Sequence, residues 1–233
     1  MHKQYMNGCA LANVQMHIGQ GLAIPAVKCY IGRVSKSMVF DSVEALSVSV
    51  RQGAGLTRLR NEAGDVFRVI QTRDLSPGGI AGRGELQEER LSGRQLDQFA
   101  ARAGQVLMPL FASSLHPVVV GAEHEGCIVS SNIAIITVNA ERVVAEYLAA
   151  VLNSESAHVR LKRVAAGASI QMLSVASLRE FLVPVPAREV QEQFARAFGL
   201  HQRAKRAAER LVQAEADRLE HAAAGLWEAA GVS

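Results

Sequence analysis

The feature that most constrains this chain is its C-terminal stretch, residues 187–230, which consists almost entirely of good helix formers. It follows the short apolar segment 181–186, in which Pro184 and Pro186 exclude a central sheet strand and favour an edge strand or an exit from a domain. A helix of about 40 residues rises about 1.5 Å per residue, so it spans roughly 60 Å, beyond the diameter of a domain of this size. Part of this helix must protrude or pair with another helix.

Apolar and small residues recur along the same stretch in a four-three alternation with one extra four-residue step, which is typical of a coiled-coil seam with a stutter. The flanks of the seam are expected to carry charged residues: Arg203, Arg206, Glu209, Arg210, Asp217 and Glu220. The alternative is an amphipathic helix packed on its own domain. The candidate assembly residues are Val190, Phe194, Ala197, His201, Ala204, Ala208, Val212, Leu219 and Leu226.

Upstream, the pattern predicts a twisted sheet flanked by helices. Strands are indicated within residues 43–55, 65–76, 104–112, 116–126 and 127–139, separated by turns such as Ser76-Pro77-Gly78-Gly79. Helices are indicated over 141–154, with Asn139 as N-cap, and over 156–166. We therefore predict an α+β fold with a mixed or antiparallel sheet in residues 1–186, an N-terminal extension of uncertain role over 1–40, and an assembly helix over 187–233.

Composition excludes some classes of protein. The 233 residues are 49% hydrophobic, enough for a substantial core, and the net charge of +3 supports a polyanionic partner only weakly. The basic residues are nearly all arginine, which suits phosphate and guanine edges but also follows from high genomic G+C content. Cys9, Cys29 and Cys127 are far apart and signal neither disulfides nor zinc. No segment reads as a secretory core or membrane span, so a soluble, cytoplasmic protein is expected.

No catalytic motif is evident. The chain lacks a P-loop, a dinucleotide-binding glycine fingerprint, a zinc-protease helix motif and a nucleophile elbow. The glycine-rich stretch 78–85 has the wrong spacing for a phosphate cradle, and His124 and Glu125 are read as a solvated turn. We predict a non-catalytic protein that needs no cofactor and no metal, so that binding is its function.

The order of the segments resembles one half of the DNA-specificity subunit of type I restriction-modification systems. The resembling pieces are IQTRDLSPGGI, GQVLMPLFA, SSNIAIITVN, EYLAAVLNSESA and AAGASIQMLSVASLREFLVPVPAREVQEQFARAF, within residues 45–220. The resemblance implies a target recognition domain followed by a conserved-region helix. Members usually carry two such units, whose helices pair antiparallel while each domain reads half of a split DNA target. One unit would then pair with a second copy or with another subunit.

The implied partners are double-stranded DNA and a DNA methyltransferase subunit, and the methyl donor and ATP would belong to the partners. Phosphate contacts are expected from arginines and lysines at loops, and base contacts from polar side chains. The candidate DNA-binding residues are Arg58, Arg60, Gln71, Thr72, Arg73, Arg83, Lys162, Arg163, Ser169 and Gln171. Solvated loop or helix surfaces are the alternative for Arg58, Arg60, Lys162 and Arg163, and a domain-stabilising hydrogen bond is the alternative for Ser169 and Gln171.

Three classes of function stay open at this stage. The leading hypothesis is a DNA-recognition subunit that positions a methyltransferase in a restriction-modification or related phage-defence complex. The second is a scaffold or regulatory subunit of a defence system that keeps the fold but no longer reads DNA. The third, a small-molecule enzyme, has no motif to support it and would need a deep polar pocket with convergent titratable groups.

Overall fold

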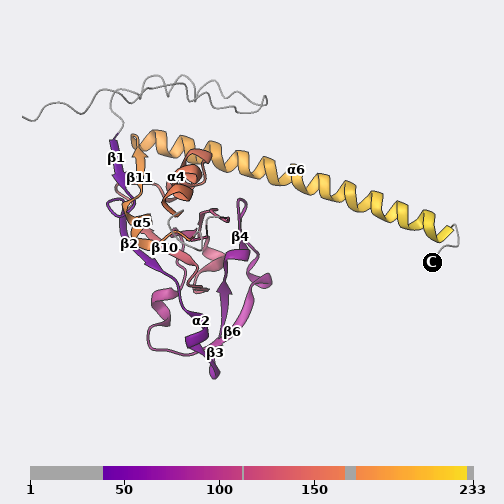
Figure 1. The fold of residues 1–233 in the computed structure, drawn as a ribbon, viewed down its shortest axis with the longest axis horizontal. Coiled ribbons are helices and arrows are strands. Elements are labelled where there is room, and N and C mark those ends of the chain that lie inside the picture. Colours follow the sequence, from indigo (N-terminus) through magenta and orange to yellow (C-terminus); the bar gives the residue numbers. More distant parts are fainter. Residues whose placement is uncertain (1–38, 112, 166–171, 230–233) are drawn as a thin grey trace, which may run out of the picture. The chain divides into compact units, whose positions relative to one another are not determined.

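The structure is a computed structural model that describes residues 39–111, 113–165 and 172–229 (Figure 1). The predicted α+β class is confirmed. In chain order the elements are β1 (Val39–Ser42), β2 (Ser47–Gln52), α2 (Leu56–Leu59), β3 (Arg60–Ile70), η1 (Thr72–Asp74), β4 (Leu75–Ser76), β5 (Gly79–Ile80), η2 (Arg83–Glu85), β6 (Gln87–Leu91), η3 (Leu96–Phe99), β7 (Val106–Pro109), β8 (Val118–Val119), η4 (Ala122–His124), β9 (Ile128–Val129), β10 (Ile133–Val138), α3 (Ala145–Leu152), α4 (Glu155–Ala165), α5 (Val175–Glu180), β11 (Leu182–Val185) and α6 (Arg188–Ala229).

The strands form small sheets rather than one continuous sheet. A four-stranded antiparallel sheet has the order β2-β10-β7-β8, and a three-stranded sheet has the order β6-β3-β9, in which β3 and β9 run parallel. β1 pairs with β11, and β4 pairs with β5. The segment 127–139, expected as one strand, is divided at residues 130–132 into β9 and β10, so that it contributes to two different sheets.

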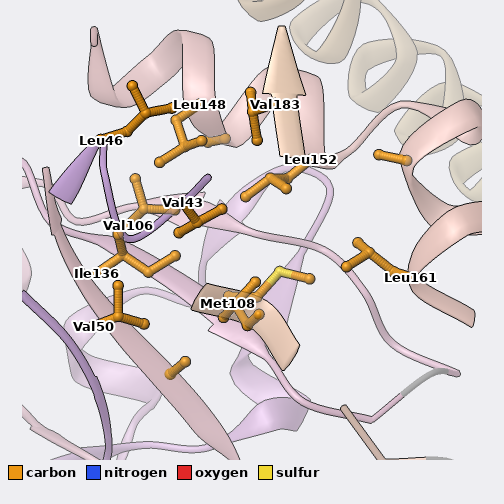
Figure 2. Close-up of a cluster of buried hydrophobic side chains, with 14 of the residues drawn as sticks. Val43, Leu46, Val50, Val106, Met108, Ile136, Leu148, Leu152, Leu161 and Val183 are labelled. Atoms are coloured by element: carbon orange, nitrogen blue, oxygen red, sulfur yellow. The ribbon is translucent and has the colours of Figure 1, made fainter. Parts of the chain in front are cut away.

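β10 lies between two hydrophobic clusters, which explains its unbroken apolar sequence. Ala134 and Ile136 face one cluster, while Ile133 and Ile135 face the other, as the alternation of side chains along a strand requires. All four side chains are fully buried. The first cluster also holds buried residues of β2, β7, α3, α4 and β11, several of which are drawn in Figure 2. This shared core joins the sheet to the helices that follow it.

The first of these helices begins later than its pattern indicates. Asn139 was expected as the N-cap of a helix from Glu141, but α3 begins at Ala145. The Asn139 side chain instead accepts a hydrogen bond from the Glu141 backbone N–H at 3.0 Å, which closes a local turn. Asparagine side chains stabilise such turns as readily as helix starts, so the residue type did not distinguish the two.

β3 and β6 form a long antiparallel pair that the sequence pattern only half revealed. The irregular register between Arg60 and Asp65 places Gly64 against the partner strand, where a Cβ atom would lie 2.4 Å from the Leu91 carbonyl oxygen. β6 escaped prediction because residues 87–90 are all polar. It is an edge strand in which Glu88 and Glu89 pair with arginines of β3, and only its last residue, Leu91, is fully buried.

The proline-containing segment forms β11, which pairs with β1 alone among the strands of the described residues, so the predicted edge position is confirmed. α6 follows after two residues. Its first turns pack on the domain: the buried Gln191 accepts a hydrogen bond from the Val144 N–H with its Oε1 at 2.9 Å and donates from Nε2 to the Pro186 carbonyl at 3.0 Å. Phe194 lies against the main core cluster. The expected alternative of packing on its own domain therefore holds for this first part of the helix.

Beyond Gly199 the α6 side chains are mostly exposed to solvent. Leu211, Val212, Leu219 and Leu226 are between 65% and 74% exposed, although they are large and apolar. Among the described residues, no helix is long and apolar enough to cross a membrane.

Candidate nucleic-acid interface

The candidate site begins at the end of β3, where the chain leaves the sheet through η1 and makes the β4–β5 hairpin. The Asp74 carboxylate accepts a hydrogen bond from the Gln71 backbone N–H at 2.8 Å, which fixes the η1 turn. The hairpin then turns through Pro77 and Gly78, as the Ser-Pro-Gly-Gly sequence predicts, and Gly79 takes a φ of 123°. These local contacts place Gln71 and Arg73 on an exposed face beside β6.

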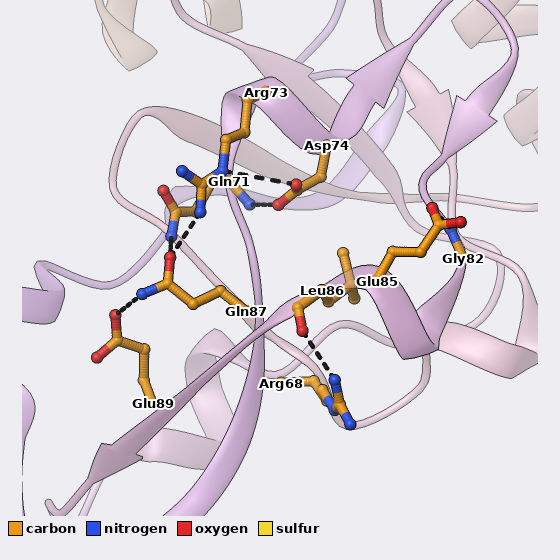
Figure 3. A network of polar contacts seen from close by, with 9 residues as sticks. All are labelled: Arg68, Gln71, Arg73, Asp74, Gly82, Glu85, Leu86, Gln87 and Glu89. Atoms are coloured by element: carbon orange, nitrogen blue, oxygen red, sulfur yellow. Dashed lines mark hydrogen bonds and ion pairs between the residues drawn. The ribbon is translucent and has the colours of Figure 1, made fainter.

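Gln87 of β6 holds those two side chains together (Figure 3). Its Oε1 accepts hydrogen bonds from Gln71 Nε2 at 3.0 Å and from Arg73 Nη2 at 2.6 Å, and its own Nε2 donates to Glu89 Oε1 at 2.7 Å. Arg60 closes the chain of contacts with a two-pronged ion pair to Glu89, at 2.6 and 2.9 Å. We call Arg60, Gln71, Arg73, Gln87 and Glu89 the Gln87 network. The hydrogen bonds and the ion pair that Arg60 makes with Glu89 raise the pKa of the Arg60 guanidinium.

The network leaves one amide partly free. Gln71 uses one N–H of its side chain, and its Oε1 and second N–H have no partner among the residues that the structure describes. An amide that offers one acceptor and one donor side by side matches the N6–H and N7 edge of adenine in the major groove. The network therefore holds the Gln71 amide in a defined orientation beside β6.

Three of the predicted DNA-binding residues, Arg60, Gln71 and Arg73, are thus brought together. Arg83 lies apart, because its Nη1 donates to the carbonyls of Glu123 and Glu125, both at 2.8 Å. The hydroxyl oxygen of Thr72 is buried and has no hydrogen-bond partner within the described part of the chain, so it does not present itself to a groove.

The remaining predicted residues lie outside the network. Arg58 is exposed in the last turn of α2, and Lys162 and Arg163 are exposed in the last turn of α4. Ser169 and Gln171 fall outside the described residues, as does most of the predicted N-terminal extension. Sequence reasoning missed Gln87 and Glu89, for which the only available signal was the polar run 87–90 beside an alternating strand.

A cleft of about 680 Å³ opens next to the network, between the β4–β5 hairpin and α6. We call it the arginine cleft, since four arginines line it against two carboxylates, those of Asp74 and Glu85: Arg73, Arg203, Arg206 and Arg210. The hairpin approaches the helix so closely that a Cβ atom at Gly78 would lie 2.6 Å from Arg206 Nη1. Arg73 belongs to both the cleft and the Gln87 network.

The helix arginines do not flank the assembly seam as expected. At about 100° per residue, Arg203 and Arg210 project about 160–180° away from Val212, and Arg206 about 120° away. The arginines therefore occupy the face toward the hairpin, while the exposed apolar residues occupy the other side. The four-three alternation identified the apolar face correctly as a pattern but did not reveal which element the cationic face meets.

Four side chains outside the network, those of His116, His158, Cys127 and Tyr147, have shifted pKa values. His116 and His158 contact each other edge to face, with ring centroids 5.9 Å apart, and burial lowers the pKa of both. Burial likewise raises the pKa of the Cys127 thiol and raises the pKa of Tyr147 to about 12. No group of three or more His, Cys, Asp or Glu side chains within the described ranges is placed to hold a metal ion.

Comparison with known proteins rests on structure alone. No family profile matches the sequence, and no curated protein is significantly similar to it. One solved structure, from a study of complex assembly and conformational transition of the type I restriction-modification system, superimposes with a TM-score of 0.57 at 16% identity and covers 78% of this chain and 46% of its own. The HsdS subunit from Thermoanaerobacter tengcongensis gives a TM-score of 0.55 at 17% identity, covering 79% and 47%. This chain has the fold of an HsdS subunit.

The resemblance noted in the sequence is therefore confirmed at the level of the fold. Sequence identities of 16% and 17% show a shared architecture only, so the HsdS-like fold does not by itself assign a site or an activity. The chain spans about half the length of the two chains that it matches.

Proposed function

We propose that this protein is the DNA-recognition subunit of a type I-like restriction-modification or methyltransferase-based defence complex. It carries no catalytic role of its own and positions a DNA methyltransferase on its target. The HsdS-like fold supports this assignment. The single observation that carries it is the Gln87 network, in which Gln71 and Arg73 are both anchored on one amide oxygen while the remaining amide groups of Gln71 have no hydrogen-bond partner among the described residues.

Within this proposal, the surface residues divide into two roles. Gln71 reads a base edge, because its orientation is fixed by Gln87 and a rigid amide discriminates between bases better than a mobile one. Arg58, Lys162 and Arg163 contact phosphates, which positions the duplex without sequence information.

Assembly through α6 is the second part of the proposal. A single recognition unit pairs with a second copy through the exposed apolar face that includes Val212, Leu219 and Leu226, and a methyltransferase subunit binds the resulting helical spacer. Monomeric proteins rarely leave a row of large apolar side chains in solvent, which supports a partner for this face.

Selection from a pool of random duplexes tests the proposal. The wild-type chain is mixed with the pool, bound duplexes are recovered and sequenced, and the result expected is an enriched motif. Gln71→Ala and Gln87→Ala are expected to relax the preference at one position of that motif. Gln98→Ala is the matched control, since Gln98 is an exposed glutamine in η3 whose amide donates to Gln95 rather than to the network. No enrichment above the input pool contradicts base reading by this chain.

A scaffold that keeps the fold without reading DNA is the alternative, and one observation favours it. Three surface arginines already have protein partners and are not left open for phosphates. Arg60 pairs with Glu89 and Arg68 with Glu88, while Arg83 donates to two backbone carbonyls. Such a scaffold would bind duplexes with no sequence preference or not at all, whereas the recognition subunit binds a preferred duplex with strong salt dependence.

A further inference from the structure

We propose that the arginine cleft binds successive phosphates of the DNA backbone, so that α6 contacts DNA as well as serving assembly. The helix then has two working faces. One meets a partner helix, and the other meets the duplex that the β4–β5 hairpin and η1 present to it. This inference rests on the proposed DNA-binding function and adds a specific place and partner on a helix otherwise assigned to assembly.

The charge and spacing of the cleft carry the inference. Arg203, Arg206 and Arg210 follow one face of α6 at intervals of three and four residues and extend over about 10 Å of helix, the rise of about three nucleotides along one strand of a duplex. Guanidinium groups bind phosphate oxygens with two parallel hydrogen bonds, which favours a phosphate group over an anion that cannot accept both bonds. Ala207, in the middle of this face, leaves room for the backbone to approach.

The helix arginines have no competing partners. Ion pairs on α6 involve Arg188, Arg196, Lys205 and Arg218, and within the described part of the chain no carboxylate lies within ion-pair distance of the three cleft arginines. The two acids that line the cleft have partners other than the helix arginines. Asp74 accepts a hydrogen bond from the Gln71 N–H at 2.8 Å and forms an ion pair with Arg73 Nε at 3.8 Å, and Glu85 accepts from the Gly82 N–H at 3.3 Å.

The position of Arg73 favours duplex DNA over other anions as the ligand of the arginine cleft. Arg73 Nη2 contacts Gln87 in the base-reading network, and the same side chain lines the cleft, so the two sites are contiguous. A duplex whose base edge meets Gln71 therefore has its backbone beside Arg73 and the helix. Interhelical ion pairs are the competing use for these arginines, but their projection away from Val212 makes them poor partners for a helix docked on the apolar face.

Two double variants with equal charge change test the inference in the full chain. Arg203→Gln/Arg210→Gln removes two cleft arginines, and Arg196→Gln/Arg218→Gln removes two exposed arginines of the same helix. Affinity for a fluorescein-labelled duplex is measured by anisotropy across a salt series. The cleft variant is expected to weaken binding about tenfold or more at moderate salt and to reduce the salt-dependence slope by about two, one for each lost phosphate contact. The control variant is expected to change both quantities much less.

The possible outcomes distinguish a failure of the cleft assignment from a failure of the proposed DNA-binding function. If the wild type binds duplex DNA and the two variants lose the same affinity and slope, the cleft assignment is wrong while DNA recognition stands. If the wild type binds no duplex, both are wrong. Loss of dimer mass in the cleft variant, measured by light scattering, would also overturn the inference, because it would assign these arginines to helix pairing. Both variants change exposed side chains, so their melting curves should match that of the wild type.

Discussion

The ring of Phe194 in α6 packs edge-on against the ring of Tyr147 in α3, with centroids 5.7 Å apart and planes inclined by 72°. The Tyr147 hydroxyl donates in turn to the Pro184 carbonyl at 2.8 Å. One aromatic pair thus connects the base of the long helix to the core and to the strand that precedes it. A truncation meant to remove the assembly helix should therefore retain these turns, and a cut after Leu200 is preferable to one after Pro186.

Phe194→Ala should destabilise the domain by about 1–3 kcal/mol, because it removes a partly buried aromatic contact and leaves a gap beside Tyr147. Urea unfolding monitored by circular dichroism measures the change. Leu200→Ala is the control, since Leu200 is 60% exposed on the same helix and should cost less than about 0.5 kcal/mol. Equal effects for the two variants would show that the first turns of α6 are not fastened to the core.

Gly64→Ala should be strongly destabilising, because the added Cβ would meet the Leu91 carbonyl oxygen at 2.4 Å, a backbone atom that cannot move without disturbing the β3–β6 register. A loss of about 1–3 kcal/mol is expected from such overpacking. The matched control is Gly84→Ala, since a Cβ atom there has no neighbour within 4 Å among the described residues. Thermal unfolding of both variants checks this, and a tolerated Gly64→Ala would contradict the irregular pairing at that point.

The His116–His158 pair predicts acid sensitivity. Burial lowers the pKa of both rings in the folded protein, and Lys205 near His116 and Lys162 near His158 act in the same direction. The unfolded chain therefore takes up more protons, so stability is fully present above a pH of about 6.5 and falls as the pH drops below that value. His116→Gln/His158→Gln should flatten this part of the profile of unfolding free energy against pH, whereas His221→Gln, an exposed α6 residue, should not.

Leu219→Glu should convert a dimer into a monomer, because it places a charge in the apolar face proposed for helix pairing. Gln213→Glu adds the same charge about 120° around the helix from Leu219 and should leave the dimer intact. Light scattering over a range of protein concentrations distinguishes them. A wild-type chain that stays monomeric throughout would show that this face awaits a different subunit.

The parts of the fold that follow from periodicity were predictable. The buried strands β2, β7 and β10 show apolar residues in alternation or in unbroken runs, and the length and spacing of α6 read directly from its helix formers. β6 was not predictable, because an edge strand stabilised by side-chain pairs such as Arg68–Glu88 carries no apolar signature. The use of Gln87 as an anchor depended on register across two strands, which no local pattern encodes.

Only part of the candidate site could be predicted from the sequence, because contacts that depend on register and packing leave no local pattern. Arg60 follows from its place after a glycine turn, Arg73 from a strand end and Gln71 from its polar amide, and the structure brings the three together. The arginine cleft combines residues more than a hundred positions apart, so only the packing of α6 against the hairpin reveals it.

Reading of a DNA sequence by this chain is measured by the ratio of its affinities for a selected duplex and for a scrambled duplex of equal length. Both affinities should be measured on the full chain at the same near-physiological salt, since phosphate contacts contribute equally to the two. A ratio on the order of 10³ or more is expected for the wild type, and Gln71→Ala should reduce it. A ratio near one, with duplex binding otherwise intact, would contradict sequence reading by this chain.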